Sequence, residues 1–218
     1  MNGRTDKKRR EVSGALRCAF NTALMTSAHT AFAEALAKVF VREGLRVLTP
    51  ESFGVCAPES VDIYVDTSDS TDGRDVFTEG AGLDESLTRR IYEHNVLRPM
   101  TLLEAHLKAL IGGQGRRLCF LSSRAALTSS ALADSNWAYK LSKAALHMFL
   151  QMAANKLLPM GFTFRLFDPL CGLLAPEAAA EAAFSYFTRR RGTERDNPMR
   201  DDETRLVLRD ALGGEHAW

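Results

Sequence analysis

Residues 117–146 read RLCFLSSRAALTSSALADSNWAYKLSKAAL, and this stretch decides the fold. Its first five residues form a mostly apolar run that predicts a buried strand, which ends at Ser122 and Ser123. Tyr139 lies 16 positions after Ser123, and Lys143 lies four positions after Tyr139. On a helix, a separation of four residues places both side chains on one face. The stretch therefore predicts a serine at a strand end, followed by a tyrosine and a lysine on one helix face.

These residue types in this pattern indicate proton transfer. A lysine beside a phenol is expected to lower the pKa of Tyr139, so that the phenol exchanges a proton near neutral pH. The Ser123 hydroxyl is placed to polarise a carbonyl group toward that phenol. Asn95 is expected on a neighbouring helix, where it would hold a water molecule that relays the proton. The four side chains together predict acid/base chemistry on a small carbonyl or alcohol.

Apolar periodicity continues on both sides of this stretch. Strands are expected over 19–25, 45–48, 61–65, 117–121, 162–167 and 205–208, the last of them at the sheet edge. Helices are expected over 27–43, 83–110 with an interruption near Pro99, 139–158 and 175–188. A strand, a helix and a strand in succession predict a parallel sheet that is buried on both faces. Residues 49–60 are too few for a further strand with two helices.

The sequence resembles the short-chain dehydrogenase/reductase family over about 19–218. The strongest stretches are NVLRP at 95–99, LCFLSSR at 118–124 and WAYKLSKAAL at 137–146. The wide serine-to-tyrosine spacing and the ending RDALGGEHAW at 209–218 look like the small C-factor or sniffer-like carbonyl reductase branch.

This resemblance implies a fold, a catalytic set and a cofactor. The implied fold is α/β, a Rossmann-type doubly wound parallel sheet in a single domain over 18–218, shortened between the second and fourth family strands. The implied catalytic residues are Asn95, Ser123, Tyr139 and Lys143, and Lys143 would also bond the nicotinamide ribose. The implied cofactor is NAD or NADP, and the implied partners are a small-molecule carbonyl substrate and a second copy of the chain in a homodimer.

The turn that would hold the cofactor departs from the family pattern. The family places a glycine-rich turn after the first strand so that the backbone approaches the pyrophosphate. Here residues 26–33 read TSAHTAFA, without a glycine. Ser27 and Ala31 add Cβ atoms where positive φ or close approach is normal, and Phe32 is expected beside the pyrophosphate path. The N-terminus of the following helix still offers free N–H groups to an anion.

Two other family motifs are altered. Asp66-Thr67-Ser68-Asp69 replaces Asn-Asn-Ala-Gly and brings two carboxylates close to the cofactor position. Pro169-Leu170 replaces Pro-Gly, with Gly172 as a partial substitute. The residues expected to contact a cofactor are Thr26, Ser27, Ala28, Thr30, Phe32, Thr67, Lys143 and Pro169.

Composition narrows the class of protein. The chain has 218 residues, 45% of them hydrophobic, and a formal net charge of +1, which gives no electrostatic case for nucleic acid. No apolar run reaches the length of a membrane-spanning helix, so no membrane partner is expected. Four separated cysteines are expected to be buried thiols in a reducing compartment, and the histidines have no metal-site spacing.

The N-terminal residues 1–17 are polar and contain the basic run KKRR at 7–10. They are expected to form a flexible basic tail, with a targeting or partner-docking arm as the alternative. The segment lacks the apolar stretch of a secretory signal, so a cytoplasmic location is expected, and organellar import stays open.

Two functions follow from these features. The first is an oxidoreductase that transfers a hydride between a nicotinamide cofactor and a small carbonyl or alcohol, with Tyr139 as the acid/base. The alternative is a non-catalytic pseudoenzyme that uses the fold as a scaffold or assembly subunit with protein partners. The retained catalytic residues favour the first, and the altered cofactor turn favours the second.

Overall fold

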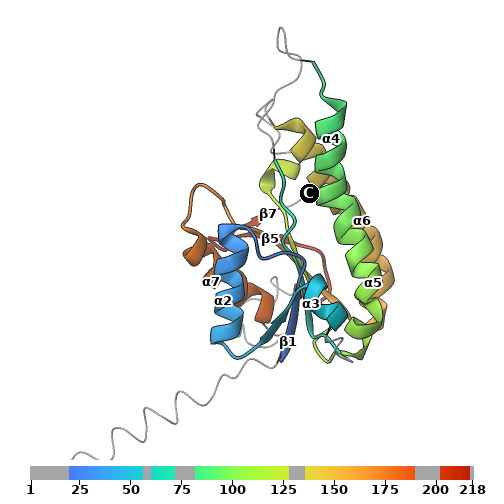
Figure 1. Cartoon of the computed structure of the whole chain (residues 1–218), viewed down its shortest axis with the longest axis vertical. Coiled ribbons are helices and arrows are strands. Elements are labelled where there is room, and N and C mark those ends of the chain that lie inside the picture. The colour runs from blue at the N-terminus through green and yellow to red at the C-terminus, as the bar shows by residue number, and fades with distance from the viewer. Residues whose placement is uncertain (1–19, 56–59, 72–81, 128–135, 190–201, 217–218) are drawn as a thin grey trace, which may run out of the picture.

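The computed structural model describes residues 20–55, 60–71, 82–127, 136–189 and 202–216, which Figure 1 shows as a sheet between two layers of helices. The basic tail expected over 1–17 lies outside the described residues. No helix among the described residues is both long and apolar enough to cross a membrane.

The described strands form one seven-stranded sheet in the order β2-β1-β3-β4-β5-β6-β7. The strands are β1 Thr22–Met25, β2 Arg46–Leu48, β3 Ile63–Asp66, β4 Arg117–Leu121, β5 Thr163–Asp168, β6 Leu208–Asp210 and β7 Glu215–His216. All pairings are parallel except that of β6 with β7. The chain runs outward from β1 to β2 and then returns to β3 on the other side of β1. The carboxyl ends of β1 and β3 therefore flank the topological switch point, where open α/β sheets bind ligands.

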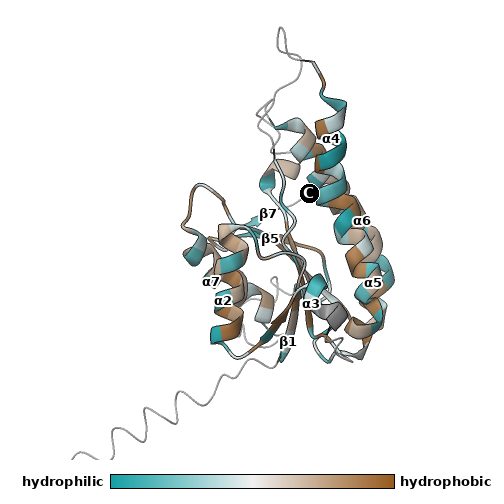
Figure 2. Cartoon of the chain, in the orientation of Figure 1, coloured by the Kyte–Doolittle hydropathy of each residue, from teal (hydrophilic) through white to brown (hydrophobic). Residues whose placement is uncertain are grey.

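Helices cover both faces of this sheet. They are α2 Ala31–Arg42, α3 Pro50–Val55, α4 Glu85–Tyr92, α5 Arg98–Gly112, α6 Trp137–Leu157 and α7 Pro176–Thr188, with the π-helical turn η1 Glu93–Leu97 and the 3₁₀ turns η2 Arg124–Ala126 and η4 Leu158–Met160. One apolar core lies between the sheet and α2 with α7, and the other lies between the sheet and α5 with α6. Figure 2 shows that hydrophobic residues concentrate on the strands and on the helix faces turned toward them. The predicted Rossmann-type doubly wound sheet is confirmed.

The predicted shortening is also confirmed. Between β2 and β3 the described residues hold only the short helix α3, and β2 is the outermost strand on its side. The family's third strand therefore has no counterpart among the described residues.

Three predicted boundaries need correction. The first strand begins at Thr22 instead of residue 19, and the first helix begins at Ala31 instead of residue 27. Thr30 caps that helix by accepting a hydrogen bond from Ala33 N at 3.2 Å, so the preceding residues form a loop. The strand expected over 205–208 is instead β6, and it is not at the edge, because a glycine turn returns the chain as β7. Gly213 takes the positive φ of 85° that this turn needs.

The interruption expected near Pro99 is the π-helical turn η1. Arg98 N donates to Glu93 O, five residues back, instead of the usual four. Pro99 has no N–H to donate to Asn95 O, which removes the regular bond at this point. The turn places Asn95 and Val96 in the interior.

Candidate active site

The candidate site lies at the carboxyl ends of the central strands, where two cavities adjoin. The larger has a volume of about 530 Å³ and is lined by Ser123, Tyr139 and residues that follow β5. The smaller has a volume of about 410 Å³ and extends to the start of α2 at Thr30, Ala31 and Phe32. Asp69, Pro169 and Cys171 line both cavities. A ligand with one end at α2 and the other at Tyr139 would therefore pass these three residues.

Ser123 and Tyr139 come together as predicted. Ser123 follows β4 directly, caps η2 by accepting a hydrogen bond from Ala125 N at 3.1 Å, and hydrogen-bonds with the Tyr139 phenol. Tyr139 stands in the first turn of α6, and its phenol reaches Ser123, which follows β4. Both side chains are half-buried and face the larger cavity.

Lys143 is fully buried beneath Tyr139. Its Nζ lies 5.7 Å from the centroid of the Tyr139 ring, as the spacing of four residues predicted. The ammonium donates hydrogen bonds to Ser68 O at 2.8 Å and Leu121 O at 3.2 Å. It also forms an ion pair with Asp69 Oδ1 at 3.2 Å. Lys143 therefore already has three oxygen partners within the chain.

The expected lowering of the Tyr139 pKa is wrong for this structure. Burial of the phenol raises its pKa, and the carboxylate of Asp69, which accepts a hydrogen bond from the phenol, raises it further. The Ser123 hydroxyl acts in the opposite direction, and the more distant Asp168 adds to the increase. The sequence prediction considered Lys143 alone, whereas Asp69 pairs with the lysine and offsets its charge. The phenol is therefore held in its protonated form.

Asn95 has a different set of contacts from the one expected. Its side chain is fully buried, accepts a hydrogen bond from Ser70 N at 2.8 Å and donates to Ser70 O at 2.8 Å. It also donates to Ser142 Oγ at 2.9 Å. These bonds tie the loop after β3 to α6. Asn95 therefore positions Asp69 and Lys143, which stand next to its partners in sequence.

The altered turn between β1 and α2 is unstrained. Among the described residues, positive φ outside glycine occurs only at Arg116, Asn136 and Leu170, so the turn from Thr26 to Phe32 needs no glycine for its backbone. Phe32 is 5% exposed and packs into the core below the smaller cavity. Phe32 therefore lies in the wall of the smaller cavity, with its ring packed into the core.

Polar contacts hold this turn to the end of β3. Thr67 N donates to Thr26 Oγ1 at 3.0 Å, and Thr67 Oγ1 donates to Ser27 O at 2.7 Å. Thr26 Oγ1 in turn donates to Asp66 Oδ1 at 2.9 Å. Burial raises the pKa of Asp66, and Lys143 with the hydroxyls of Ser68 and Thr26 opposes that rise. Thr26, Ser27 and Thr67 therefore form one linked group, while Ala28 lies in the loop between them and Thr30.

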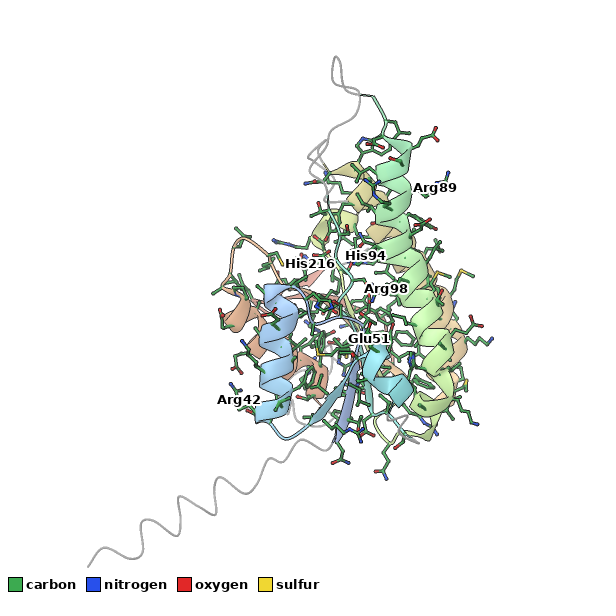
Figure 3. The ribbon with its side chains drawn as sticks, in the orientation of Figure 1. Arg42, Glu51, Arg89, His94, Arg98 and His216 are labelled. Carbon is green, nitrogen blue, oxygen red and sulfur yellow. The ribbon has the colours of Figure 1, made fainter. Side chains whose placement is uncertain are left out.

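A positive side chain borders the same turn. Arg98 donates to Thr26 O at 3.2 Å from the start of α5. Figure 3 shows Arg98 between Glu51 of α3 and His94 of η1. Glu51 has its pKa lowered by hydrogen bonding to its own backbone and to Thr49, with a smaller contribution from Arg98. Arg98 thus connects α5 to this turn and carries a positive charge near Glu51.

The segment after β5 closes the site from the other side. Asp168 accepts hydrogen bonds from Arg124 N at 2.9 Å and Leu170 N at 2.9 Å, which positions Pro169 on both cavities. Leu170 stands at the family's glycine position and takes a φ of 54°, a left-handed conformation that disfavours a branched side chain. Gly172 has a φ of 84° two residues later.

Three features of this site were not predicted from the sequence. Ser122 Oγ makes a short hydrogen bond with His147 Nε2, and burial lowers the pKa of His147 to about 4, with Lys143 contributing. The spacing of four residues between Lys143 and His147 could have indicated that His147 lies on the same face of α6 as Lys143. Cys171 is exposed and lines both cavities, which corrects the expectation of a buried thiol, whereas Cys119 is buried. The contact of Asp69 with both Lys143 and Tyr139 joins residues about 70 positions apart in sequence.

No cluster of three or more histidine, cysteine or acidic side chains that could hold a metal occurs within the described part of the chain.

Comparison with known proteins places the fold. No family sequence model matches the chain, and no curated protein matches its sequence. Solved structures do match. The candidate carbonyl reductase Sniffer of Caenorhabditis elegans superposes with a TM-score of 0.73 at 13% identity, over 92% of this chain and 100% of that one. A carbonyl reductase from Pseudomonas aeruginosa in complex with NADP gives a TM-score of 0.68 at 17% identity, over 91% and 100%.

A third structure is an oxidoreductase of the short-chain dehydrogenase/reductase family from Brucella ovis in complex with partially ordered NAD. It gives a TM-score of 0.60 at 18% identity, over 78% of this chain and 94% of that one. The chain therefore has the fold of short-chain dehydrogenases/reductases, as the sequence resemblance predicted.

Proposed function

We propose that this chain is an oxidoreductase of the short-chain dehydrogenase/reductase type, which transfers a hydride between NAD or NADP and a small carbonyl or alcohol. The observation that carries the proposal is the convergence of Ser123, Tyr139 and Lys143 beside two adjoining cavities at the switch point of the sheet. Similar structures in complex with NAD and NADP support the choice of cofactor.

The residues present fit such a cofactor. The smaller cavity begins at the N-terminus of α2, where backbone N–H groups favour an anion, and no strained backbone or projecting ring closes it. The phosphate and ribose side of the cofactor would be held by Thr26, Ser27, Ala28, Thr30, Phe32 and Thr67. Its nicotinamide side would be held by Lys143 and Pro169. When bound there, the nicotinamide supplies the hydride donor or acceptor.

The side chains in the larger cavity would handle the substrate oxygen. Ser123 and Tyr139 would donate hydrogen bonds to a carbonyl oxygen and polarise it. As the carbonyl carbon gains a hydride, the Tyr139 O–H bond breaks and its proton moves to the oxygen, which gives the alcohol. Lys143 would stabilise the phenolate that remains. Because the pKa of Tyr139 is raised, the protonated phenol favours reduction of carbonyls over oxidation of alcohols at neutral pH.

The test is binding and turnover with one matched variant pair. Wild-type protein should bind NADH or NADPH in calorimetry and reduce members of a small aldehyde and ketone panel. Tyr139→Phe should reduce turnover by about 10²-fold or more while cofactor binding is kept. Tyr92→Phe, which alters an exposed tyrosine of α4, should leave both unchanged. If wild-type protein binds neither cofactor at millimolar concentration, the oxidoreductase proposal fails and the scaffold alternative takes its place.

A further inference from the structure

Asp69 is the residue that makes this site different from a simple serine, tyrosine and lysine set. It stands in the loop after β3, at the position where the family resemblance expects glycine. Its side chain is 26% exposed and lines both cavities, so it lies at their junction. A residue in that place meets any ligand that extends from the start of α2 to Tyr139.

Its carboxylate engages the two residues on which the proposed chemistry depends. Asp69 Oδ1 pairs with Lys143 Nζ at 3.2 Å, and the carboxylate accepts a hydrogen bond from the Tyr139 phenol. The remaining donors of the Lys143 ammonium point to Ser68 O and Leu121 O. A ribose hydroxyl must therefore compete with the Asp69 carboxylate for the third donor of the Lys143 ammonium.

The ion pair between Asp69 and Lys143 can also separate at low cost. Asp69 Oδ1 has no aligned hydrogen bond, so the contact with Lys143 is electrostatic and lacks the added strength of good geometry. If Asp69 moves away, Lys143 keeps both carbonyl partners and the nearby buried Asp66, which interacts with it electrostatically. Opening therefore does not leave a buried lysine without any counter-charge.

We propose that Asp69 is an internal competitor for Lys143, which must be displaced before the nicotinamide ribose of a dinucleotide can bind there. The inference rests on the proposed function, because it concerns how that cofactor gains its lysine contact. Asp69 thereby lowers the affinity of the resting site for dinucleotides, since only the fraction of molecules with Lys143 released is competent to bind. It acts on cofactor binding and is not itself an acid/base in the reaction.

The experiment compares two ligands across a small set of variants. NADH carries the nicotinamide ribose, whereas ADP carries only the adenosine and phosphates and does not extend to Lys143. Asp69→Asn and Asp69→Ala should lower the dissociation constant for NADH by about tenfold or more in calorimetry, with that for ADP unchanged. Asp84→Asn removes a carboxylate that caps α4 outside the cavity lining, and it should change neither constant. Thermal unfolding of each variant reports whether the fold is kept. If one of the two Asp69 variants fails to fold, the other still tests the proposal.

Each outcome has a definite meaning. A lower dissociation constant for NADH alone supports the proposal that Asp69 competes with the cofactor for Lys143. An equal gain for NADH and ADP overturns it, because the cause is then general repulsion between Asp69 and an anionic ligand. An unchanged affinity for NADH in folded variants also overturns the proposal for Asp69. The proposed function survives that result if the wild-type protein binds NADH and reduces a carbonyl substrate. If no form of the protein binds NADH, the proposed function itself fails, and the inference fails with it.

Discussion

Phe32 stacks on Phe167, with ring centroids 6.4 Å apart and an angle of 25° between the ring planes. Phe32 stands in the first turn of α2, directly after the turn that contains no glycine, and Phe167 belongs to β5. The contact directs the largest side chain of the turn into the core between the sheet and α7. The turn therefore gains apolar packing and keeps the cavity above it. Because the Phe32 ring packs into the core, the smaller cavity stays open although the turn before α2 contains no glycine.

The raised pKa of Tyr139 predicts a difference between the two reaction directions. Burial is the largest cause of this raised pKa, and it holds the phenol protonated whether or not Asp69 is displaced. Reduction needs the protonated phenol, so its rate should stay level from about pH 6 to about pH 9. Oxidation needs the phenolate, so its rate should rise with pH throughout that interval. Initial rates in both directions at constant ionic strength check this, and an oxidation rate that levels off near neutral pH would contradict it.

His147 predicts a loss of stability in mild acid. Its pKa is lowered from 6.5 to about 4 by burial, so between these values the unfolded chain binds a proton that the folded chain does not. The contribution of neutral His147 to the free energy of unfolding is fully present above about pH 6.5. It declines as the pH falls toward 4, by about 3 kcal/mol at most. Urea unfolding at pH 7.5 and pH 5 should show the decline in wild-type protein. His147→Gln, which can keep a hydrogen bond to Ser122, should show a smaller difference between the two values.

Leu170 predicts an inverted order of stability between glycine and alanine. Both substitutions remove the same buried side chain, but only glycine adopts a φ of 54° without steric strain. Leu170→Gly should therefore be more stable than Leu170→Ala by about 1 kcal/mol, although glycine has the greater entropy in the unfolded chain. Chemical unfolding of the two variants gives the comparison. A more stable alanine variant would show that this backbone relaxes when the leucine is removed.

Cys171 provides a readout of cofactor binding that is independent of turnover. It is exposed and lines both cavities, and burial together with Asp69 and Asp168 raises the pKa of its thiol. Alkylation should be slow at neutral pH and faster in alkaline buffer. Saturating NADH should then slow the labelling of Cys171, as followed by mass spectrometry of the modified peptide. Cys171→Ser assigns the signal, and labelling that NADH does not affect would place the cofactor elsewhere.

We propose that the chain forms a homodimer through α5 and α6. Met148 and Met152 of α6 are each 65% exposed, and Ile111 of α5 is 38% exposed, so the outer faces of both helices carry apolar side chains. Light scattering after size-exclusion chromatography should give the mass of a dimer, and Met148→Glu with Met152→Glu should give a monomer. Met160→Glu, in the 3₁₀ turn η4, serves as the matched control. A wild-type monomer at micromolar concentration would exclude this interface.

The sequence predicted the parallel sheet and the meeting of three polar side chains at its strand ends, because both depend on local patterns. The bounds of β4 were predicted without error, since its five residues are all buried and two serines end the run. The convergence of Ser123, Tyr139 and Lys143 followed from helix geometry and from the strand end. The boundaries near Thr30 and Leu208 were missed, because a capping threonine and a glycine hairpin determine them and apolar periodicity does not.

The electrostatic state of the site could not be predicted in the same way. The two carboxylates at 66 and 69 were expected near the cofactor, but their effect on Tyr139 depends on which one reaches Lys143. Only the folded chain brings Asp69 into contact with Lys143 and holds the adjacent Ser70 by Asn95. The direction of the Tyr139 pKa shift therefore changed sign between sequence and structure.

Among the described strands, β2 is the last one on its side of the sheet. An unpaired edge can recruit a strand from another molecule and lead to aggregation. Here that edge is only three residues long, and Arg46 at its start is exposed. A short edge with a charged residue offers a neighbouring chain few backbone groups to pair with. The described edge of the sheet is thus poorly suited to intermolecular strand addition.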